Sequence, residues 1–211
     1  MRRVIAASVA SVGLVVALAV WLAACQPKPA NSLPTDMSLG SPSAKVTVTE
    51  YASLGCPICA MWNNDNFAAF KAKYIDTNQV HYVLKEMTNG DGPVATAGFL
   101  LARCAGKDKY FQVVDSVWRE EAPYLESDKA AEKANALRKI AESAGLSDQQ
   151  FDTCVTNDAA RDQLNKKVEQ TVATDHVEAT PTFMVNGKVC DDCQDPKNLD
   201  KAILAAEGAS K

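Results

Sequence analysis

Two cysteines, in the motif Cys56-Pro57-Ile58-Cys59, stand where a predicted strand gives way to a predicted helix. The preceding segment, 46–51, is rich in β-branched side chains, which favours a strand. Aromatic side chains follow the motif at helical spacing: Trp62, Phe67, Phe70 and Tyr74. Cys56 is therefore expected in the first turn of the helix. Unpaired backbone N–H groups and the positive end of the helix dipole favour a thiolate there.

A cysteine with a lowered pKa and a second thiol one turn away is the arrangement that thiol–disulfide exchange requires. The alternatives are a small structural disulfide or half of a zinc site. A zinc site built from this motif and the later Cys190-x-x-Cys193 would need ligands about 130 residues apart, which is not the usual spacing. The two histidines, His81 and His176, do not complete a metal set. We expect neither a metal nor an organic cofactor.

The N-terminal segment 4–24 is apolar and uncharged, and it follows Arg2 and Arg3. This pattern indicates an export signal or a membrane anchor. Leu22-Ala23-Ala24-Cys25 resembles the lipobox of bacterial lipoproteins, which implies cleavage of a signal peptide, 1–24, and lipidation of Cys25. The alternatives are an uncleaved anchor, or cleavage near Ala24 without lipidation. In each case we expect an extracytoplasmic (periplasmic) domain tethered to a membrane.

The residues after Cys25 are expected to form a lipidated, flexible tether, 25–44, because they contain four prolines and no periodic apolar pattern. The remainder, 45–211, is predicted to be a single domain. With 211 residues and 47% hydrophobic residues, the chain is long enough to bury a core. Its net charge of -4 and its lack of a Lys/Arg cluster argue against nucleic-acid binding.

The chain has seven cysteines, and setting Cys25 aside leaves six, an even number that suits a disulfide-permissive compartment. The natural grouping joins the two adjacent pairs, Cys56–Cys59 and Cys190–Cys193. A Cys104–Cys154 disulfide then follows by elimination.

The order of the remaining predicted elements indicates an α/β fold. A second strand is followed by a helical block, then by a hairpin whose Asn-Gly turn is a strong signal, and finally by a helix. These elements are expected at 80–84, about 93–178, 182–185 with 188–190, and 199–206. Ser147 begins a capping box inside the helical block. This order is that of a thioredoxin fold with a helical insertion.

Thr180-Pro181-Thr182 directly precedes the predicted hairpin. With this motif, the C-P-x-C motif and an insertion of this length, the chain resembles the DsbA-like family of exported thiol:disulfide oxidoreductases, including its BdbD branch. The resemblance covers about residues 45–206. It implies that Pro181 is cis and faces the active-site cysteines, shielding the sulfurs. It also implies that Thr180 pairs with substrate through its backbone in a strand-like manner.

Cys56 is expected to be the nucleophile and Cys59 to resolve the mixed disulfide. Glu50 shares a strand face with apolar residues and matches the buried acid of thioredoxin-like proteins, so it is a candidate to accept the Cys59 proton; the alternative is an ordinary exposed glutamate. Lys85 is a candidate charge partner for Glu50, although a solvated surface lysine is the simpler interpretation.

The two residues between the active-site cysteines are expected to tune the pair and to contact substrate. Pro57 resembles the DsbA pattern. Ile58 replaces the histidine of the family's strongest oxidants and cannot stabilise a Cys56 thiolate, which predicts a milder oxidant.

The other two disulfides are interpreted as structural. Cys104–Cys154 would close a long loop inside the insertion. The two aspartates between Cys190 and Cys193 should raise the thiol pKa values, which favours a structural bond over a relay to the active site.

The predicted function is the oxidation of reduced, exported polypeptides by dithiol exchange, with a quinone-linked membrane partner reoxidising the protein, as the resemblance implies. The alternatives are a reductase or isomerase of the same fold, kept reduced by a membrane electron donor, and a non-catalytic, disulfide-stabilised peptide-binding lipoprotein. We expect a monomer because the segment before residue 45 is too short to be a dimerisation domain.

Overall fold

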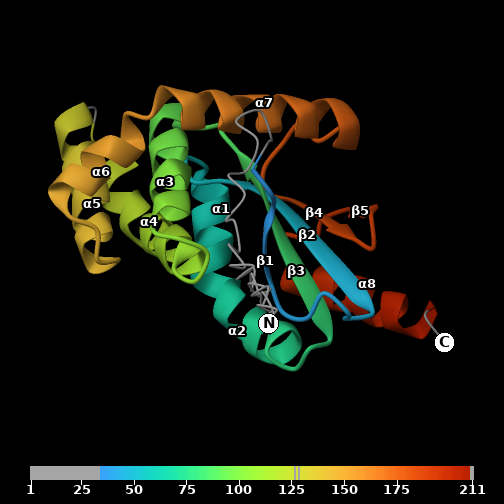
Figure 1. Cartoon of the computed structure of the whole chain (residues 1–211). Helices are drawn as coiled ribbons and strands as arrows, with labels where there is room; N and C mark the ends of the chain where they lie inside the picture. The colour runs from blue at the N-terminus through green and yellow to red at the C-terminus, as the bar shows by residue number, and fades with distance from the viewer. Residues whose placement is uncertain (1–33, 126, 128, 210–211) are drawn as a thin grey trace, which may run out of the picture. The chain divides into compact units, whose positions relative to one another are not determined.

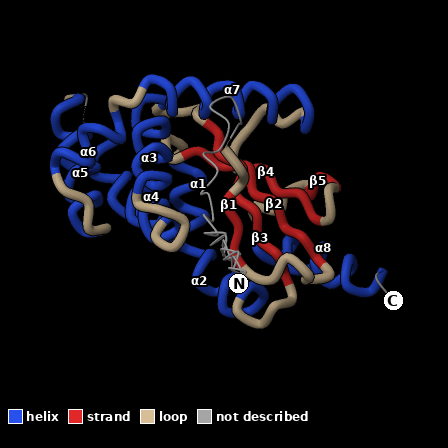
Figure 2. Tube along the Cα trace, viewed as in Figure 1, coloured by secondary structure: helices blue, strands red, loops and turns tan. Residues whose placement is uncertain are grey.

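A computed structural model describes residues 34–125, 127 and 129–209 of the chain, all of which belong to one compact unit spanning residues 31–211. Figure 1 shows its elements in chain order and Figure 2 separates helices from strands. The strands are β1 (Met37–Leu39), β2 (Val46–Ser53), β3 (Val80–Met87), β4 (Thr182–Val185) and β5 (Lys188–Cys190). The helices are α1 (Pro57–Trp62), α2 (Ala68–Phe70), α3 (Gly92–Cys104), α4 (Tyr110–Leu125), α5 (Ala130–Ser143), α6 (Asp148–Val155), α7 (Asp158–Asp175) and α8 (Pro196–Ala209). Two π-helical turns, η1 (Asn63–Phe67) and η2 (Lys71–Ile75), join α1 and α2 into one continuous helical run.

The strands form a mixed sheet in the order β1-β3-β2-β4-β5. The central pair, β2 and β3, is parallel, and every other neighbouring pair is antiparallel. Because β2 and β3 are parallel, the loops after Ser53 and after Met87 leave the sheet at the same edge. The segment that enters β4 at Thr182 meets this edge too, since Tyr51 pairs with Thr182 in antiparallel register.

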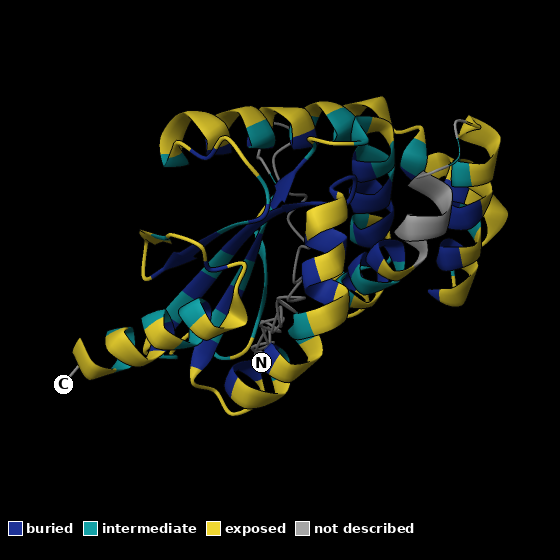
Figure 3. Ribbon diagram, turned by 180° about the vertical axis from the view of Figure 1, so that it is seen from behind, coloured by how far each residue is buried: buried dark blue, intermediate teal, exposed yellow. Residues whose placement is uncertain are grey.

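Helices cover the two faces of the sheet unequally. The run from α1 to η2 lies on one face together with α8; Trp62 and Phe70 of the run line a common cavity with Leu199 of α8. On the other face, Val168 of α7 packs against a small cluster that includes Tyr51. Figure 3 shows the buried residues concentrated in the sheet and on the helix faces that contact it. The larger core therefore lies on the α1 face.

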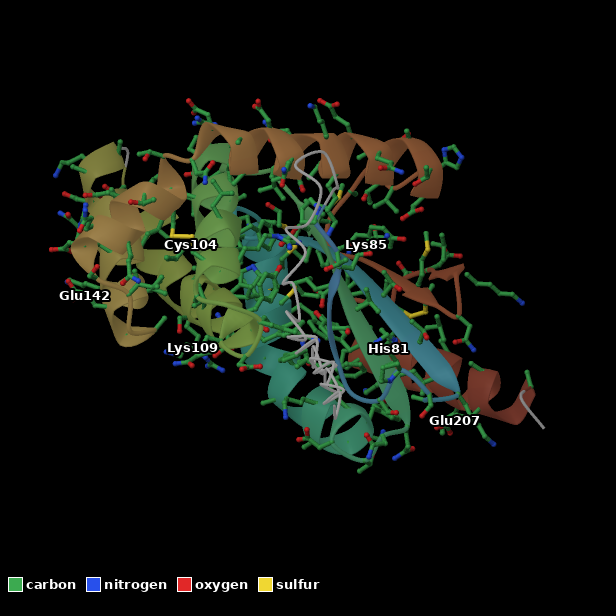
Figure 4. All side chains as sticks on the ribbon, in the orientation of Figure 1. His81, Lys85, Cys104, Lys109, Glu142 and Glu207 are labelled. Carbon is green, nitrogen blue, oxygen red and sulfur yellow. A yellow bond between two sulfur atoms is a disulfide. The ribbon has the colours of Figure 1, made fainter. Side chains whose placement is uncertain are left out.

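The arrangement has the predicted α/β character, and the helical block between β3 and β4 runs from Gly92 to Asp175. A disulfide joins Cys104 of α3 to Cys154 of α6 within this block, as Figure 4 shows at Cys104. The hairpin strands have the predicted bounds, and Ser147 forms the capping box with Gln150. No helix in the described part of the chain is long and apolar enough to span a bilayer.

The predicted tether, 25–44, differs from the structure at its C-terminal end. Met37–Leu39 form β1, which pairs with β3, so the sheet begins before residue 45. The physical reason is that Met37 and Leu39 pack against the main core while their backbone pairs with the free edge of β3. The predicted signal peptide and Cys25 lie outside the described residues.

Candidate active site

Cys56 is the N-cap residue of α1, directly after the sharp turn that follows β2. Its backbone is extended, with φ −109° and ψ 112°, and its Sγ accepts a hydrogen bond from the Cys59 backbone N–H at 3.4 Å. Pro57 occupies the first helical turn, where its missing N–H leaves no bond unmade. The sequence thus places a sulfur where a serine or aspartate oxygen would ordinarily cap a helix.

The surroundings of Cys56 favour its thiolate. Together they lower the pKa of Cys56 from 9.0 to about 5. The hydrogen bond from the Cys59 thiol is the largest cause, burial opposes it, and the Thr180 side chain and the backbone N–H groups of Ile58 and Cys59 contribute to the lowering. At pH 7 the reduced form of Cys56 is therefore ionised, ready to act as a nucleophile or a leaving group.

Cys59 has the opposite character. Its side chain is fully buried, whereas that of Cys56 is 6% exposed. Burial is the largest cause that raises the pKa of Cys59, and the hydrogen bond to Cys56 and the nearby Glu50 carboxyl add to it. The pair is thus divided into an ionised outer sulfur and a protonated inner one.

Glu50 is 1% exposed on β2, among the side chains of the main core. Burial raises the pKa of Glu50 from 4.5 to about 8, although a hydrogen bond from the Tyr82 hydroxyl to Oε2, at 2.6 Å, partly opposes the shift. Its other oxygen, Oε1, has no hydrogen-bond partner among the described residues. A carboxyl group of this kind holds a proton near neutral pH and can exchange it with a neighbouring thiol.

The Thr180–Pro181 peptide bond is cis, and Thr180 lies against Cys56. In its protonated form, the Cys56 thiol donates to the Thr180 carbonyl oxygen at 3.4 Å. The Asn89 side-chain amide donates to Thr180 Oγ1 at 2.6 Å, so the hydroxyl proton of Thr180 is free to point toward Cys56. Residues that are distant in sequence thereby form one site.

Two loops pack backbone against backbone to hold the turn before Cys56. The Asp91 N–H donates to the Gly55 carbonyl oxygen at 2.8 Å, and Ser53 Oγ donates to the Asn89 carbonyl oxygen at 2.6 Å. Gly90 has φ +75°, and a Cβ there would lie 1.9 Å from the Gly55 carbonyl oxygen. Only glycine fits this position, because both the backbone conformation and the space exclude a side chain.

The helical insertion contacts the same loops. Trp118 of α4 donates its indole N–H to the Ser53 carbonyl oxygen at 3.1 Å. Lys133 of α5 forms an ion pair with Asp91, whose carboxylate also caps α3 through the Val94 N–H. The insertion therefore supports the active-site turn directly.

The structure brings together the predicted residues Cys56, Cys59, Glu50, Thr180 and Pro181. A Cys56–Cys59 disulfide is predicted from the sequence, whereas the structure holds both as free thiols, the reduced state of the same pair. Pro57 and Ile58 are exposed beside them, Ile58 to 47%.

Lys85 does not pair with Glu50. Its ammonium group lies 3.1 Å from Asp36 and 3.5 Å from Asp175. Lys85 pairs in register with Tyr51, the residue after Glu50. The side chains of Lys85 and Glu50 therefore point to opposite faces of the sheet. Figure 4 labels Lys85.

Tyr82 and Asn89 also belong to the site, although neither is predicted from the sequence. Tyr82 lies on the same strand face as its buried neighbours Val80 and Leu84, so strand alternation beside a buried acid is the signal that could have identified it. Asn89 belongs to a turn-rich segment, and no local pattern reveals its contact with Thr180, 91 residues away. Within the described residues, no group of three or more His, Cys, Asp or Glu side chains is arranged to hold a metal ion.

Comparison with known proteins identifies relatives of this chain. A family model described as "Thioredoxin" matches residues 32–205. A protein of Rickettsia typhi named "Putative protein-disulfide oxidoreductase" is 31% identical over 153 residues, which cover 72% of this chain and 55% of that protein. The chain thus spans about half the length of this relative.

Two further similarities are more distant. "Disulfide bond formation protein D" of Bacillus subtilis is 26% identical over 78% of this chain and 74% of that protein. The crystal structure of alpha-DsbA1 from Wolbachia pipientis superposes with a TM-score of 0.68 at 23% identity, covering 85% of this chain and 96% of that one. These matches confirm the fold class predicted from the sequence.

Proposed function

The chain belongs to the thioredoxin family, and we propose that it is a thiol:disulfide oxidoreductase that oxidises reduced, exported polypeptides through Cys56 and Cys59. The observation that carries the proposal is the division of the pair into a thiolate-favouring outer sulfur, Cys56, and a proton-holding inner sulfur, Cys59. A relative named as a protein-disulfide oxidoreductase supports the same chemistry.

In the proposed reaction, a substrate thiolate attacks Cys56 Sγ of the oxidised pair and breaks the Cys56–Cys59 bond. Cys59 leaves and takes up a proton, which Glu50 supplies because its carboxyl group is protonated near pH 7. A second substrate thiolate then attacks the substrate sulfur of the mixed disulfide. Cys56 leaves as a thiolate, a good leaving group because its pKa is low.

We propose that the substrate lies against Thr180, pairing with its backbone in a strand-like manner, while Pro181 shields the sulfurs and Pro57 and Ile58 contact the substrate. The exposed side chain of Ile58 supports this role. No metal or organic cofactor enters these steps.

The direction of electron flow is proposed from the same electrostatics. A low Cys56 pKa stabilises the reduced pair, which makes the disulfide a stronger oxidant. The reduction potential of Cys56–Cys59, measured in glutathione buffers with Cys190 and Cys193 replaced by serine, tests this. A value of about -120 to -180 mV supports oxidation of polypeptides, and a value near about -270 mV would indicate a reductase.

Two variants test the chemistry in that same background. Cys59→Ser should trap a mixed disulfide when its Cys56 thiolate attacks a model substrate whose cysteine is activated as a mixed disulfide with a small thiol: the small thiol leaves, and no resolving thiol remains to release the substrate. Cys56→Ser should trap none and should lose oxidation of the substrate. If the protein that retains Cys56 oxidises the substrate no faster than Cys56→Ser does, it is a non-catalytic binding protein.

The cellular setting is proposed from the sequence alone. We propose that the protein is an extracytoplasmic, monomeric lipoprotein anchored through Cys25, and that a quinone-linked membrane oxidase reoxidises Cys56–Cys59. Mass analysis of the protein from bacterial membranes tests the anchor: a diacylglyceryl group on Cys25 supports it, and release of the Cys25→Ala variant from the membrane is expected.

A further inference from the structure

The Cys190–Cys193 disulfide lies outside the site described above. It joins the end of β5 to the turn before α8 and spans only three positions in sequence, against 50 for Cys104–Cys154. A disulfide and a fold stabilise each other to the same extent, by thermodynamic linkage. A bond that closes so short a loop restricts the unfolded chain little, so the fold protects it least against reduction.

A groove of about 470 Å³ opens beside this disulfide, between the β4–β5 hairpin and α8. Small alanine side chains of α8 line one wall, and the hairpin lines the other with two valines, Cys190, Asn186 and Lys188. Its lining includes Val185, Val189, Cys190, Ala202, Ala205 and Ala206. Since β5 is the outermost strand of the described sheet, an extended segment can lie along it.

The two sulfurs differ in access. Cys190 lines the groove and is half-buried, whereas Cys193 is 1% exposed. Cys190 also pairs in register with Phe183, whose ring centroid lies 4.8 Å from that of Trp62 on α1. The second disulfide is therefore held on the same sheet face as the helix that carries Cys56 and Cys59.

We propose that Cys190–Cys193 is a second thiol–disulfide exchange site, and that its partner is an extended, apolar polypeptide segment carrying two thiols. A thiolate of the segment attacks Cys190 Sγ and breaks the Cys190–Cys193 bond, and Cys193 leaves as a thiolate and takes a proton from solvent. The second thiolate of the segment attacks the mixed disulfide and releases Cys190, which is protonated in turn. Two electrons pass to Cys190 and Cys193, and the segment is oxidised to a disulfide.

The first test uses the full chain with Cys56→Ser and Cys59→Ser, so that it is independent of the proposed active site. The protein is equilibrated in glutathione buffers of increasing reducing strength, quenched with acid, alkylated and mapped by mass spectrometry, while circular dichroism follows the fold. The proposal expects Cys190–Cys193 to be reduced reversibly while Cys104–Cys154 stays oxidised and the fold is retained. Reduction of both disulfides together, or only on unfolding, would overturn it.

The second test asks which sulfur is attacked and whether the groove binds the segment. In the same background, Cys193→Ser leaves a free Cys190 and Cys190→Ser leaves a free Cys193. The probe is a valine-rich peptide whose single cysteine is activated as a mixed disulfide. It should label Cys193→Ser at least about tenfold faster than Cys190→Ser, because Cys190 is the accessible thiol. Equal rates, or faster labelling of Cys190→Ser, would contradict the proposal.

A substitution in the groove separates peptide binding from the reactivity of the thiol. Ala205→Trp, added to Cys193→Ser, should slow labelling by the peptide and leave labelling by oxidised glutathione unchanged. Leu204→Trp is the matched control, since the neighbouring Leu204 is 57% exposed and does not line the groove. If the two tryptophan variants are labelled by the peptide at the same rate, the groove does not bind the segment.

Discussion

Thr180→Val should make Cys56–Cys59 a weaker oxidant. The Thr180 hydroxyl lowers the pKa of Cys56, and the Asn89 amide occupies its oxygen so that its proton can point to the thiolate. Valine has nearly the shape of threonine but no hydroxyl, so the substitution removes this hydrogen bond while the cis bond and the Thr180 carbonyl contact can persist.

The size of the change in the Cys56 pKa follows from the charge on the acceptor, the Cys56 thiolate. A hydrogen bond to a charged group contributes about 1.5–3 kcal/mol, and we take the lower end because Thr180 is only half-buried. This corresponds to about one pKa unit, which moves the Cys56 pKa from about 5 to about 6. At pH 7 the reduced pair then loses about 1.4 kcal/mol of stabilisation, and the potential falls by about 30 mV.

The ultraviolet absorbance of the thiolate, followed against pH, measures the pKa, and equilibration with glutathione measures the potential. Both measurements use protein with Cys190 and Cys193 replaced by serine. Thr182→Val is the matched control, because the Thr182 hydroxyl donates to the Ala179 carbonyl oxygen instead of to the active site. If Thr180→Val and Thr182→Val give the same pKa and potential, the hydroxyl does not stabilise the thiolate.

Further predictions concern the buried acid, the loop contact and the insertion. The Glu50 pKa is raised from 4.5 to about 8, so its contribution to stability is complete below about pH 4.5 and is lost as pH rises through about 8. In the oxidised protein, Glu50 should lower the unfolding free energy by about 3 kcal/mol between about pH 4 and about pH 7. Glu50→Gln should abolish this contribution to the fall, as measured by urea denaturation. Tyr82→Phe should raise the Glu50 pKa further and extend that fall to higher pH in the same assay, because it removes the 2.6 Å hydrogen bond to the carboxylate. Gly90→Ala should cost at least about 2 kcal/mol of unfolding free energy, since its Cβ would collide with a carbonyl oxygen; an unchanged denaturation midpoint would contradict the loop packing. Replacing both Cys104 and Cys154 by serine should cost about 4 kcal/mol and leave the Cys56–Cys59 potential unchanged, which glutathione equilibration checks.

The features that the sequence predicts correctly depend on local patterns. Asn186 and Gly187 have φ values of 47° and 75°, as a two-residue hairpin turn requires, and strand alternation places Glu50 on the buried face of β2. The bounds of β2 and β3 extend two and three residues beyond those predicted, because Ser53 and Met87 continue the parallel register.

The features that the sequence does not predict depend on contacts between distant segments. Met37–Leu39 are too short to show a strand pattern, and they form β1 because the edge of β3 is available to them. The partners of Lys85 follow from the face on which the parallel register places it. The Asn89–Thr180 hydrogen bond exists only once the loops after β3 and before β4 meet.

The helical insertion holds the active-site loops in place through direct contacts. The site is assembled from loops at one edge of the sheet, and loops alone would hold it loosely. Trp118 bonds the Ser53 carbonyl oxygen in front of Cys56, and Lys133 pairs with Asp91, whose N–H bonds the Gly55 carbonyl oxygen. Two helices of the insertion thus fix the backbone on both sides of the turn. The geometry that favours the Cys56 thiolate therefore depends on the insertion as well as on the thioredoxin fold around it.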